Sequence, residues 1–461
     1  MGTSVPFARC SSISVKEYTY FANQESAVRG VSMQLTIKRI AGILQASIKL
    51  DGITVIAGQN NTGKSSVSKA LWCALSILDN PAKRVEHERQ AIYERLLDRA
   101  ISHDPSFRRV EYTYNDVRSV AQNLAALSAN GPLRRSDVKS ELVTYLPSIA
   151  DALDLKDGYQ DGFSLVDRLI EYSSISAKEI EKTLFGNMLA GEFYGQINNV
   201  DHPAAGTITL SFGRGSLQSR IANDEVEELA IREGQGASVV YIDDPLILDR
   251  LTYPPMSIRG NTLQAVGSHQ TQLRRLLIPR PRRAGDALDS IHAEVKLGQV
   301  IASLDSTVDG FIARGRDRGL VYRRPGYRND LDLRNISTGM KSFAIIKTLI
   351  REGKIREGDV LILDEPEVHL HPTWQLKYAE LIVLLYKEYN LRILLATHSP
   401  YFLRAVEVYA SHHEVADKCR YYHALGDEDG SIFQDVTYAT EEIYEDMSIP
   451  FRILDELMPE E

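Results

Sequence analysis

A glycine-rich stretch at residues 58–65, GQNNTGKS, has the residue types and spacing of a loop that binds phosphate groups. An apolar run precedes it at residues 53–57, and a helix-forming stretch follows it at residues 66–78. In this context the loop amides and the positive N-terminus of the helix can face one anion. Lys64 would reach the β and γ phosphates of a nucleotide, and the Ser65 hydroxyl would bind Mg²⁺.

The same stretch predicts the remaining nucleotide contacts. Its glycines allow a tight turn, because glycine adopts backbone conformations that are closed to other residues. A glycine turn with a chance lysine is the alternative, but the flanking strand and helix favour a P-loop with ATP and Mg²⁺ as cofactors. Besides Lys64 and Ser65, we expect the nucleotide to contact Gly58, Asn60, Asn61, Thr62, Gly63 and Ser66.

Two adjacent carboxylates, Asp364 and Glu365, follow the apolar run at residues 360–363. The run predicts a buried strand, and α/β sheets bind their ligands at the carboxyl ends of strands. Asp364 would hold Mg²⁺ through water, and Glu365 would polarise the attacking water. The alternative is that both acids cap the turn after the strand. Together with the P-loop, the pair predicts an ATPase that forms ADP and phosphate.

Ser337 and Gly339 stand at the start of a predicted helix at residues 339–353. A hydroxyl and bare backbone amides at a helix N-terminus can form an anion site, although an ordinary helix cap uses the same residues.

Two further groups of side chains could bind a metal ion. His369 and His371 lie close to the acids that follow the strand, but we expect them to shape the loop before the next helix. Asp243 and Asp244, beside Pro245, could serve a second metal, but a turn with a capping aspartate is the simpler interpretation.

The elements that must position these residues follow from the apolar periodicity. Residues 33–58 predict two or three strands, and alternating strands and helices return from residue 333 onward. The strands there are predicted at residues 360–363 and 393–397, and the helices at residues 339–353 and 372–389. Apolar strands beside the P-loop predict a parallel sheet with helices on both faces.

The sequence between these two parts is predicted to be mostly helical. Helices are predicted at residues 81–102, 117–128, 135–153, 165–172, 176–189 and 284–303, and strands at residues 207–212, 216–221, 238–242 and 320–323. We therefore predict an α/β fold of the P-loop NTPase class, with a head at residues 33–80 and 320–435. A mostly helical insertion with some strands, at residues 81–319, splits this head. Residues 1–32 would form an N-terminal appendage, and residues 436–461 an acidic C-terminal tail.

Composition limits the functional classes. The net charge of −9 argues against a surface that is basic all over. Cys10, Cys73 and Cys419 form no CxxC pair, which indicates neither a disulfide framework nor a cysteine zinc site. The longest apolar runs have the length of strands, and the N-terminus lacks the order of a signal peptide. We expect no membrane span, no secretion and a reducing cytoplasm.

From about residue 33 to 80 and from 320 to 408, the motifs and their order resemble those of the ABC-type ATPases. The Ser-x-Gly pattern of Ser337 and Gly339 is similar to the family's signature motif, although STGMK departs from the transporter pattern SGGQ. THSP at residues 397–400 resembles the family's switch motif, which implies that His398 contacts the γ phosphate and takes part in catalysis. The family's Q-loop glutamine has four candidates without distinguishing context: Gln90, Gln122, Gln160 and Gln196.

This resemblance also implies that two heads pair face to face. Lys64, Asp364, Glu365 and His398 of one chain would then share an ATP with Ser337 and Gly339 of the other. ATP would join the two heads, and hydrolysis would release them.

The long interval between the P-loop and Asp364 is similar to that of the RecF, SMC and OLD-like members. Among these, DEPEVHLHP, STGMK, THSPYF and YIDDP most resemble the PtuA family, the ATPases of Septu antiphage defence systems. That resemblance implies an oligomer that carries and regulates a separate HNH nuclease of the PtuB kind. We find no HNH arrangement, and the 63 residues after His398 are too few for a Toprim nuclease domain, so we expect no nuclease site in this chain.

Two other interpretations stay open. A repair-type clamp could bind DNA through the arginine clusters at residues 274–283 and 314–328, so nucleic acid is a further candidate partner, although such clusters also occur as solvated loop surface. A transporter subunit is disfavoured by the insertion and by STGMK. Docking of a partner on the acidic tail is the weaker alternative to a solvated tail.

Overall fold

The computed structural model describes residues 32–103, 114–147, 164–200, 204–232, 237–251, 268–279, 298, 300, 302, 304, 308–315 and 319–457. Several sequence-based predictions therefore lie wholly or largely outside the described residues. They are the appendage at residues 1–32, Gln160, the helix at residues 284–303 and the arginines at residues 280–283.

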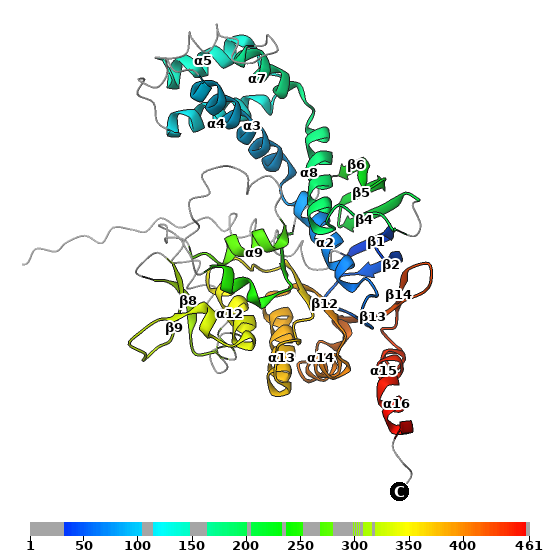
Figure 1. The fold of residues 1–461 in the computed structure, drawn as a ribbon. Coiled ribbons are helices and arrows are strands. Elements are labelled where there is room, and N and C mark those ends of the chain that lie inside the picture. Colours follow the sequence, from blue (N-terminus) through cyan, green and yellow to red (C-terminus); the bar gives the residue numbers. More distant parts are fainter. Residues whose placement is uncertain are drawn as a thin grey trace, which may run out of the picture.

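Within the described ranges, an 11-stranded sheet forms the centre of the fold (Figure 1). Its order is β6-β5-β4-β1-β2-β14-β13-β3-β12-β11-β7. The run from β13 to β7 is parallel, so the carboxyl ends of these strands meet at one edge. The bounds of this run are β13 Cys419–Leu425, β3 Ile53–Gly58, β12 Arg392–Thr397, β11 Val360–Asp364 and β7 Val239–Ile242.

The rest of the sheet is largely antiparallel and extends the head on one side. It consists of β14 Ser431–Asp435, β2 Ile43–Lys49, β1 Met33–Ile40, β4 Gly206–Phe212, β5 Gly215–Ala222 and β6 Glu225–Arg232. The predicted boundaries place residues 206–242 in the insertion, whereas β4 to β7 are part of the head's sheet. Alternating apolar residues explain this difference, because β4 buries Ile208 and Leu210 against the same core as β1.

Helices cover both faces of the parallel strands. On β11, Leu361 and Leu363 join an apolar cluster on the face of α12 (Thr338–Arg351), α13 (Pro372–Tyr389) and α14 (Pro400–His412). Ile362, which points the opposite way, joins a second cluster with α2 (Lys64–Leu78) and α8 (Ala177–Glu192). The predicted parallel sheet with helices on both faces is confirmed.

A separate group of helices, the helical lobe, stands away from the sheet in Figure 1. It consists of α3 Pro81–His103, α4 Tyr114–Ser128, α5 Arg135–Tyr145 and α7 Leu165–Ser174. The lobe has its own apolar core, to which Leu97, Leu124 and Leu169 contribute. Helices α3 and α8 lie between this core and the head, and α8 packs on α2 and β6. The position of α8 is therefore tied to both parts.

The C-terminal part adds β8 Phe311–Arg314, β9 Leu320–Arg323 and β10 Leu331–Asp332 as a small second sheet. Helices α15 (Glu441–Met447) and α16 (Ile449–Leu457) occupy most of the predicted acidic tail. None of the helices in the described ranges is both long and apolar enough to cross a membrane.

Candidate functional site

The P-loop joins β3 to α2 at the carboxyl edge of the parallel strands. Gly63, just before α2, has a φ of 76°, in the left-handed region that favours glycine. A Cβ atom at this position would also lie 3.0 Å from Ile43 Cγ1, so both conformation and space require glycine. Gly63 caps α2 with no side chain, which leaves the first amides of the helix available to a phosphate group.

Lys64 lies folded over its own loop. Its Nζ donates hydrogen bonds to the carbonyl oxygens of Gly58, at 3.0 Å, and Gln59, at 2.6 Å. Burial lowers the pKa of Lys64, and the nearby carboxylates of Glu365, Asp364 and Glu367 oppose this shift. The side chain is only 4% exposed, so its ammonium group depends on these carbonyl and carboxylate oxygens in place of water.

Asp364 ends β11 and is 7% exposed. The Tyr241 hydroxyl donates a hydrogen bond of 2.9 Å to Asp364 Oδ2, whereas Oδ1 is buried with no hydrogen-bond partner among the described residues. Burial raises the pKa of Asp364, and side-chain hydrogen bonds from Ser65 and Tyr241 oppose the shift. A buried, unpartnered carboxylate oxygen next to the Ser65 hydroxyl fits Mg²⁺, which takes oxygen ligands.

Glu365 and His398 meet at the ends of neighbouring strands. Strands β11 and β12 pair in parallel, and His398 Nδ1 lies 3.0 Å from Glu365 Oε1. Both side chains are about one-third exposed, at 38% and 35%, so they face the solvent side of the site. Glu365 has a φ of 46°, a strained backbone conformation of the kind that concentrates at functional sites.

Behind this pair lies a second, buried carboxylate. The Thr397 hydroxyl donates a hydrogen bond to Glu367 Oε1, and the amide of Ser399 donates to Thr397 Oγ1 at 3.0 Å. Burial raises the pKa of Glu367, which is 2% exposed. These contacts fix the start of α14 relative to the loop after β11.

Ser337 and Gly339 do not share a pocket with the P-loop in this chain. Ser337 caps α12, and its hydroxyl accepts a hydrogen bond of 3.3 Å from the amide of Met340. The two residues line an open hollow of about 330 Å³ with His369, His371 and Trp374, and no P-loop residue among those described lines it. A Cβ atom at Gly339 would lie 3.2 Å from Leu370 Cδ2, so the helix start packs tightly on the loop.

One residue of each group considered as a metal ligand caps a local element. His371 caps α13 and its Nδ1 accepts a hydrogen bond of 3.3 Å from the amide of Thr373. Asp244 Oδ1 accepts from the amide of Leu246 at 2.8 Å, as expected for a capping aspartate in a turn. In the part of the chain that the structure describes, no three His, Cys, Asp or Glu side chains are grouped to hold a metal ion.

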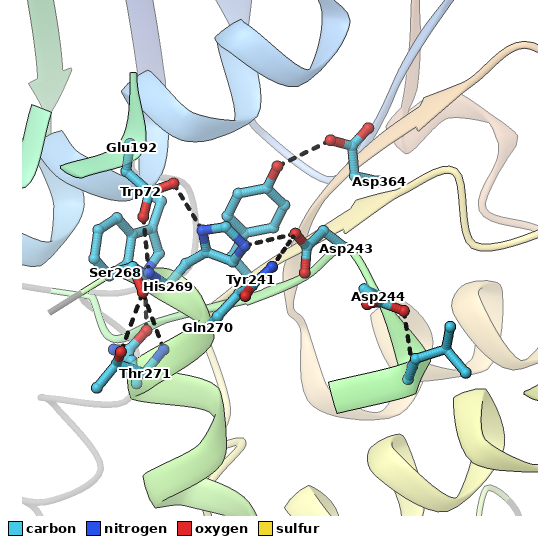
Figure 2. Close-up of polar contacts among 12 residues, drawn as sticks. Trp72, Glu192, Tyr241, Asp243, Asp244, Ser268, His269, Gln270, Thr271 and Asp364 are labelled. Atoms are coloured by element: carbon cyan, nitrogen blue, oxygen red, sulfur yellow. Dashed lines mark hydrogen bonds and ion pairs between the residues drawn. The ribbon is translucent and has the colours of Figure 1, made fainter. Parts of the chain in front are cut away.

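A buried polar cluster beside the site was not found from the sequence. It joins Glu192, at the end of α8, His269, at the start of α9 (His269–Leu277), and Asp243, just after β7 (Figure 2). His269 Nδ1 lies 2.7 Å from Glu192 Oε2, and His269 Nε2 lies 2.8 Å from Asp243 Oδ2. Burial lowers the pKa of His269, but the two carboxylates outweigh this effect and raise it to about 9.

The cluster continues to the carboxyl edge of the parallel strands, where Asp364 lies. The Tyr241 ring stacks on the His269 ring, with centroids 4.1 Å apart, and its hydroxyl reaches Asp364 (Figure 2). Asp243, Asp364 and Glu365 line one pocket of about 110 Å³. The sequence signal was the acidic turn after β7, but nothing in the sequence pairs it with His269.

Three of the four glutamine candidates lie within the described residues. Gln90 donates to Glu94 within α3 of the helical lobe, and Gln122 belongs to α4 of the same lobe. Gln196 follows α8 and is exposed. Gln270 instead donates a hydrogen bond of 3.1 Å to Asp243 Oδ2, close to the carboxylates of the site.

Two arginines of the second cluster, Arg323 and Arg324, are paired with acids. Arg323 contacts Asp330 at 2.7 Å and Arg324 contacts Asp309 at 2.5 Å. Such pairs reduce the positive field that these residues offer to a nucleic acid.

Comparisons with known proteins add the following. A family model described as AAA domain, putative AbiEii toxin, Type IV TA system matches residues 259–404, which include α9, α12, β11, α13 and β12 but not the P-loop. No curated protein matches this chain.

Three similar solved structures are SMC heads. The SMC head domain from Thermotoga maritima is 12% identical, with 87% of this chain and 98% of that chain covered and a TM-score of 0.36. An SmcHead bound to the C-winged helix domain of ScpA is 10% identical, with 89% and 98% covered and a TM-score of 0.41. An Smc head with an extended coiled coil, bound to the C-terminal domain of ScpA derived from Pyrococcus furiosus, is 10% identical, with 92% and 98% covered and a TM-score of 0.38.

The predicted α/β fold class is confirmed, with the predicted glycine-rich loop between a parallel strand and a helix. The strand order and the loop between β3 and α2, with the carboxylates at the end of β11, carry this assignment.

Proposed function

We propose that this chain binds and hydrolyses ATP as an ABC-type ATPase. The observation that carries the proposal is that Lys64 lies near Asp364, Glu365 and His398 at the carboxyl edge of the parallel strands. The matching family model, described as an AAA domain, covers Asp364, Glu365 and His398 and supports the ATPase part of this proposal.

Each of these residues has a separate role in the proposed reaction. Lys64 and the first amides of α2 bind the phosphates, and the Ser65 hydroxyl and Asp364 hold Mg²⁺. When bound, the metal neutralises charge that develops on the transferred phosphoryl group. Glu365 orients the attacking water and accepts its proton. His398, 3.0 Å from Glu365 Oε1, holds that carboxylate and contacts the γ phosphate.

The active unit is a pair of heads. Ser337 and Gly339 line a hollow apart from the P-loop, so a second copy of the chain would bring its α12 N-terminus to the nucleotide. ATP then joins the two heads, and its hydrolysis separates them.

We further propose that the oligomer is the ATPase subunit of a Septu-like antiphage defence complex and regulates a separate HNH nuclease. Support comes from the sequence motifs STGMK, DEPEVHLHP, THSPYF and YIDDP, which resemble those of the PtuA family. The head residues at the ends of β7, β11 and β12 and at the start of α12 carry these motifs.

Co-purification with the product of the neighbouring gene tests this proposal. A tag on this chain would be used for purification, and native mass spectrometry would weigh the particle with and without ATP. We expect several copies of this chain with an HNH protein. A lone chain that dimerises only with ATP, and then binds DNA with steep salt dependence, would instead identify a RecF- or SMC-like DNA repair clamp.

A further inference from the structure

Glu192, His269 and Asp243 form a largely buried group of charges beside the P-loop and its carboxylates. The side chains of Glu192 and His269 are 2% and 6% exposed, and that of Asp243 is 24% exposed. Because charges buried without partners are strongly unfavourable, such a group persists only when its geometry satisfies each member.

Each ring nitrogen of His269 lies next to a carboxylate oxygen. Glu192 is bound twice, since Oε1 accepts a hydrogen bond of 2.9 Å from the His269 amide and Oε2 lies 2.7 Å from Nδ1. The other ring nitrogen lies 2.8 Å from Asp243 Oδ2. An imidazole with a carboxylate oxygen at each nitrogen is best satisfied when both nitrogens carry protons. His269 thus bridges two acids that would otherwise repel each other.

Tyr241 connects His269 with Asp364 of the proposed ATP site. It is 1% exposed, its ring stacks on His269, and its hydroxyl donates to Asp364 Oδ2 at 2.9 Å (Figure 2). That bond leaves Oδ1 as the oxygen of Asp364 without a hydrogen-bond partner among the described residues. The tyrosine therefore fixes the orientation in which the carboxylate presents a free oxygen.

Glu192 connects His269 with helix α8. It is the last residue of α8, the helix that runs from the helical lobe to α2 and β6 (Figure 1). A shift of α8 along its axis would pull the Glu192 carboxylate away from both the amide and the ring of His269. The same helix end is thereby linked to the stacked tyrosine and to Asp364.

We propose that Tyr241 and His269 are positioning residues for the metal-binding carboxylate Asp364, and that Glu192 couples them to the helical lobe through α8. This inference depends on the proposed ATP and Mg²⁺ site. Groups that orient a metal ligand in this way typically change metal affinity or activity by about 10- to 100-fold when removed.

The first test is the binding of Mn²⁺, as a spectroscopic substitute for Mg²⁺, to full-length Tyr241→Phe. Free Mn²⁺ would be measured by electron paramagnetic resonance in the presence of a non-hydrolysable ATP analogue. Phenylalanine keeps the ring stacked on His269, and we expect the Mn²⁺ affinity to fall by about 10-fold. The matched control is Tyr444→Phe, which removes a hydroxyl that donates to Glu407 at 2.7 Å between α15 and α14. Equal Mn²⁺ affinities of the two variants would overturn the inference.

The second test addresses the coupling to α8. Glu192→Gln should weaken Mn²⁺ binding several-fold. The control is Glu380→Gln, which should not weaken it, because the Glu380 carboxylate lies outside the site and contacts His413 at a distance of 3.2 Å. In the double variant with Tyr241→Phe, the two losses should be less than additive in free energy, because both act on one carboxylate. Full additivity, or no effect of Glu192→Gln, would disprove the coupling.

The wild-type chain separates this inference from the proposed function. If it binds neither the analogue nor Mn²⁺, the proposed ATPase is wrong, and the inference falls with it. If it binds both and Tyr241→Phe does so equally well, only the positioning role fails.

Discussion

His398 Nδ1 lies 3.0 Å from Glu365 Oε1, although the two residues are carried by different strands and separated by helix α13. Parallel pairing of β11 with β12 brings their carboxyl ends side by side. The imidazole can therefore orient the carboxylate that is proposed to act on the attacking water, and each member of the pair can be tested separately.

Glu365→Gln should lower the rate of phosphate release by at least about 100-fold while leaving ATP binding intact, because the amide keeps the size of the side chain but cannot accept a proton. Phosphate release and nucleotide affinity measure the two effects. The variant should also accumulate as an ATP-bound oligomer in native mass spectrometry. Undiminished phosphate release would show that another residue is the base.

Lys64→Ala should weaken ATP binding by about 10- to 100-fold, since a charged hydrogen-bond donor to the phosphates is lost. Isothermal titration calorimetry with ATP measures this change in affinity. Lys69→Ala is the control: this lysine is on the same helix, but its Nζ lies over the Phe193 ring, 5.9 Å from the centroid. Equal affinities in the wild type and Lys64→Ala would refute the assignment of the P-loop.

Mixing two inactive variants tests the paired heads. Ser337→Arg blocks the α12 N-terminus and Lys64→Ala disables the P-loop, so each variant alone should be inactive. If each site uses both chains, random pairing should restore roughly a quarter of the sites, because half of the dimers are mixed and each has one intact site. No recovery on mixing would mean that the two motifs act within one chain.

His269→Gln should destabilise the chain most at neutral and lower pH. The carboxylates raise the pKa of His269 from 6.5 to about 9 in the folded state. A group with a raised pKa contributes its full stabilisation below pH 6.5, and the contribution is lost as the pH rises through about 9. The melting temperature of the variant should lie several degrees below that of the wild type at pH 6 and approach it near pH 10. A difference that grows with pH would contradict this linkage.

Much of the head could be predicted because its signals are local. The strand before the P-loop, the helix after it and the acids after residues 360–363 depend on neighbouring residues, and all lie where they were predicted. The boundary between the insertion and the head could not be predicted in the same way. Periodicity indicates that residues 207–212 form a strand, but not that this strand pairs with β1 in the head.

The sequence by itself determined which residues could bind phosphate and metal, since glycine, lysine, hydroxyl and carboxylate spacing act through the local backbone. Only the tertiary structure decided that Glu192, Tyr241 and His269 lie together beside Asp364. These residues come from separate elements. A buried charge needs a partner close to it in space, and closeness in space between separate elements leaves no pattern in the sequence. The contacts that connect the helical lobe with Asp364, the carboxylate proposed to bind metal, could therefore be identified only in the folded chain.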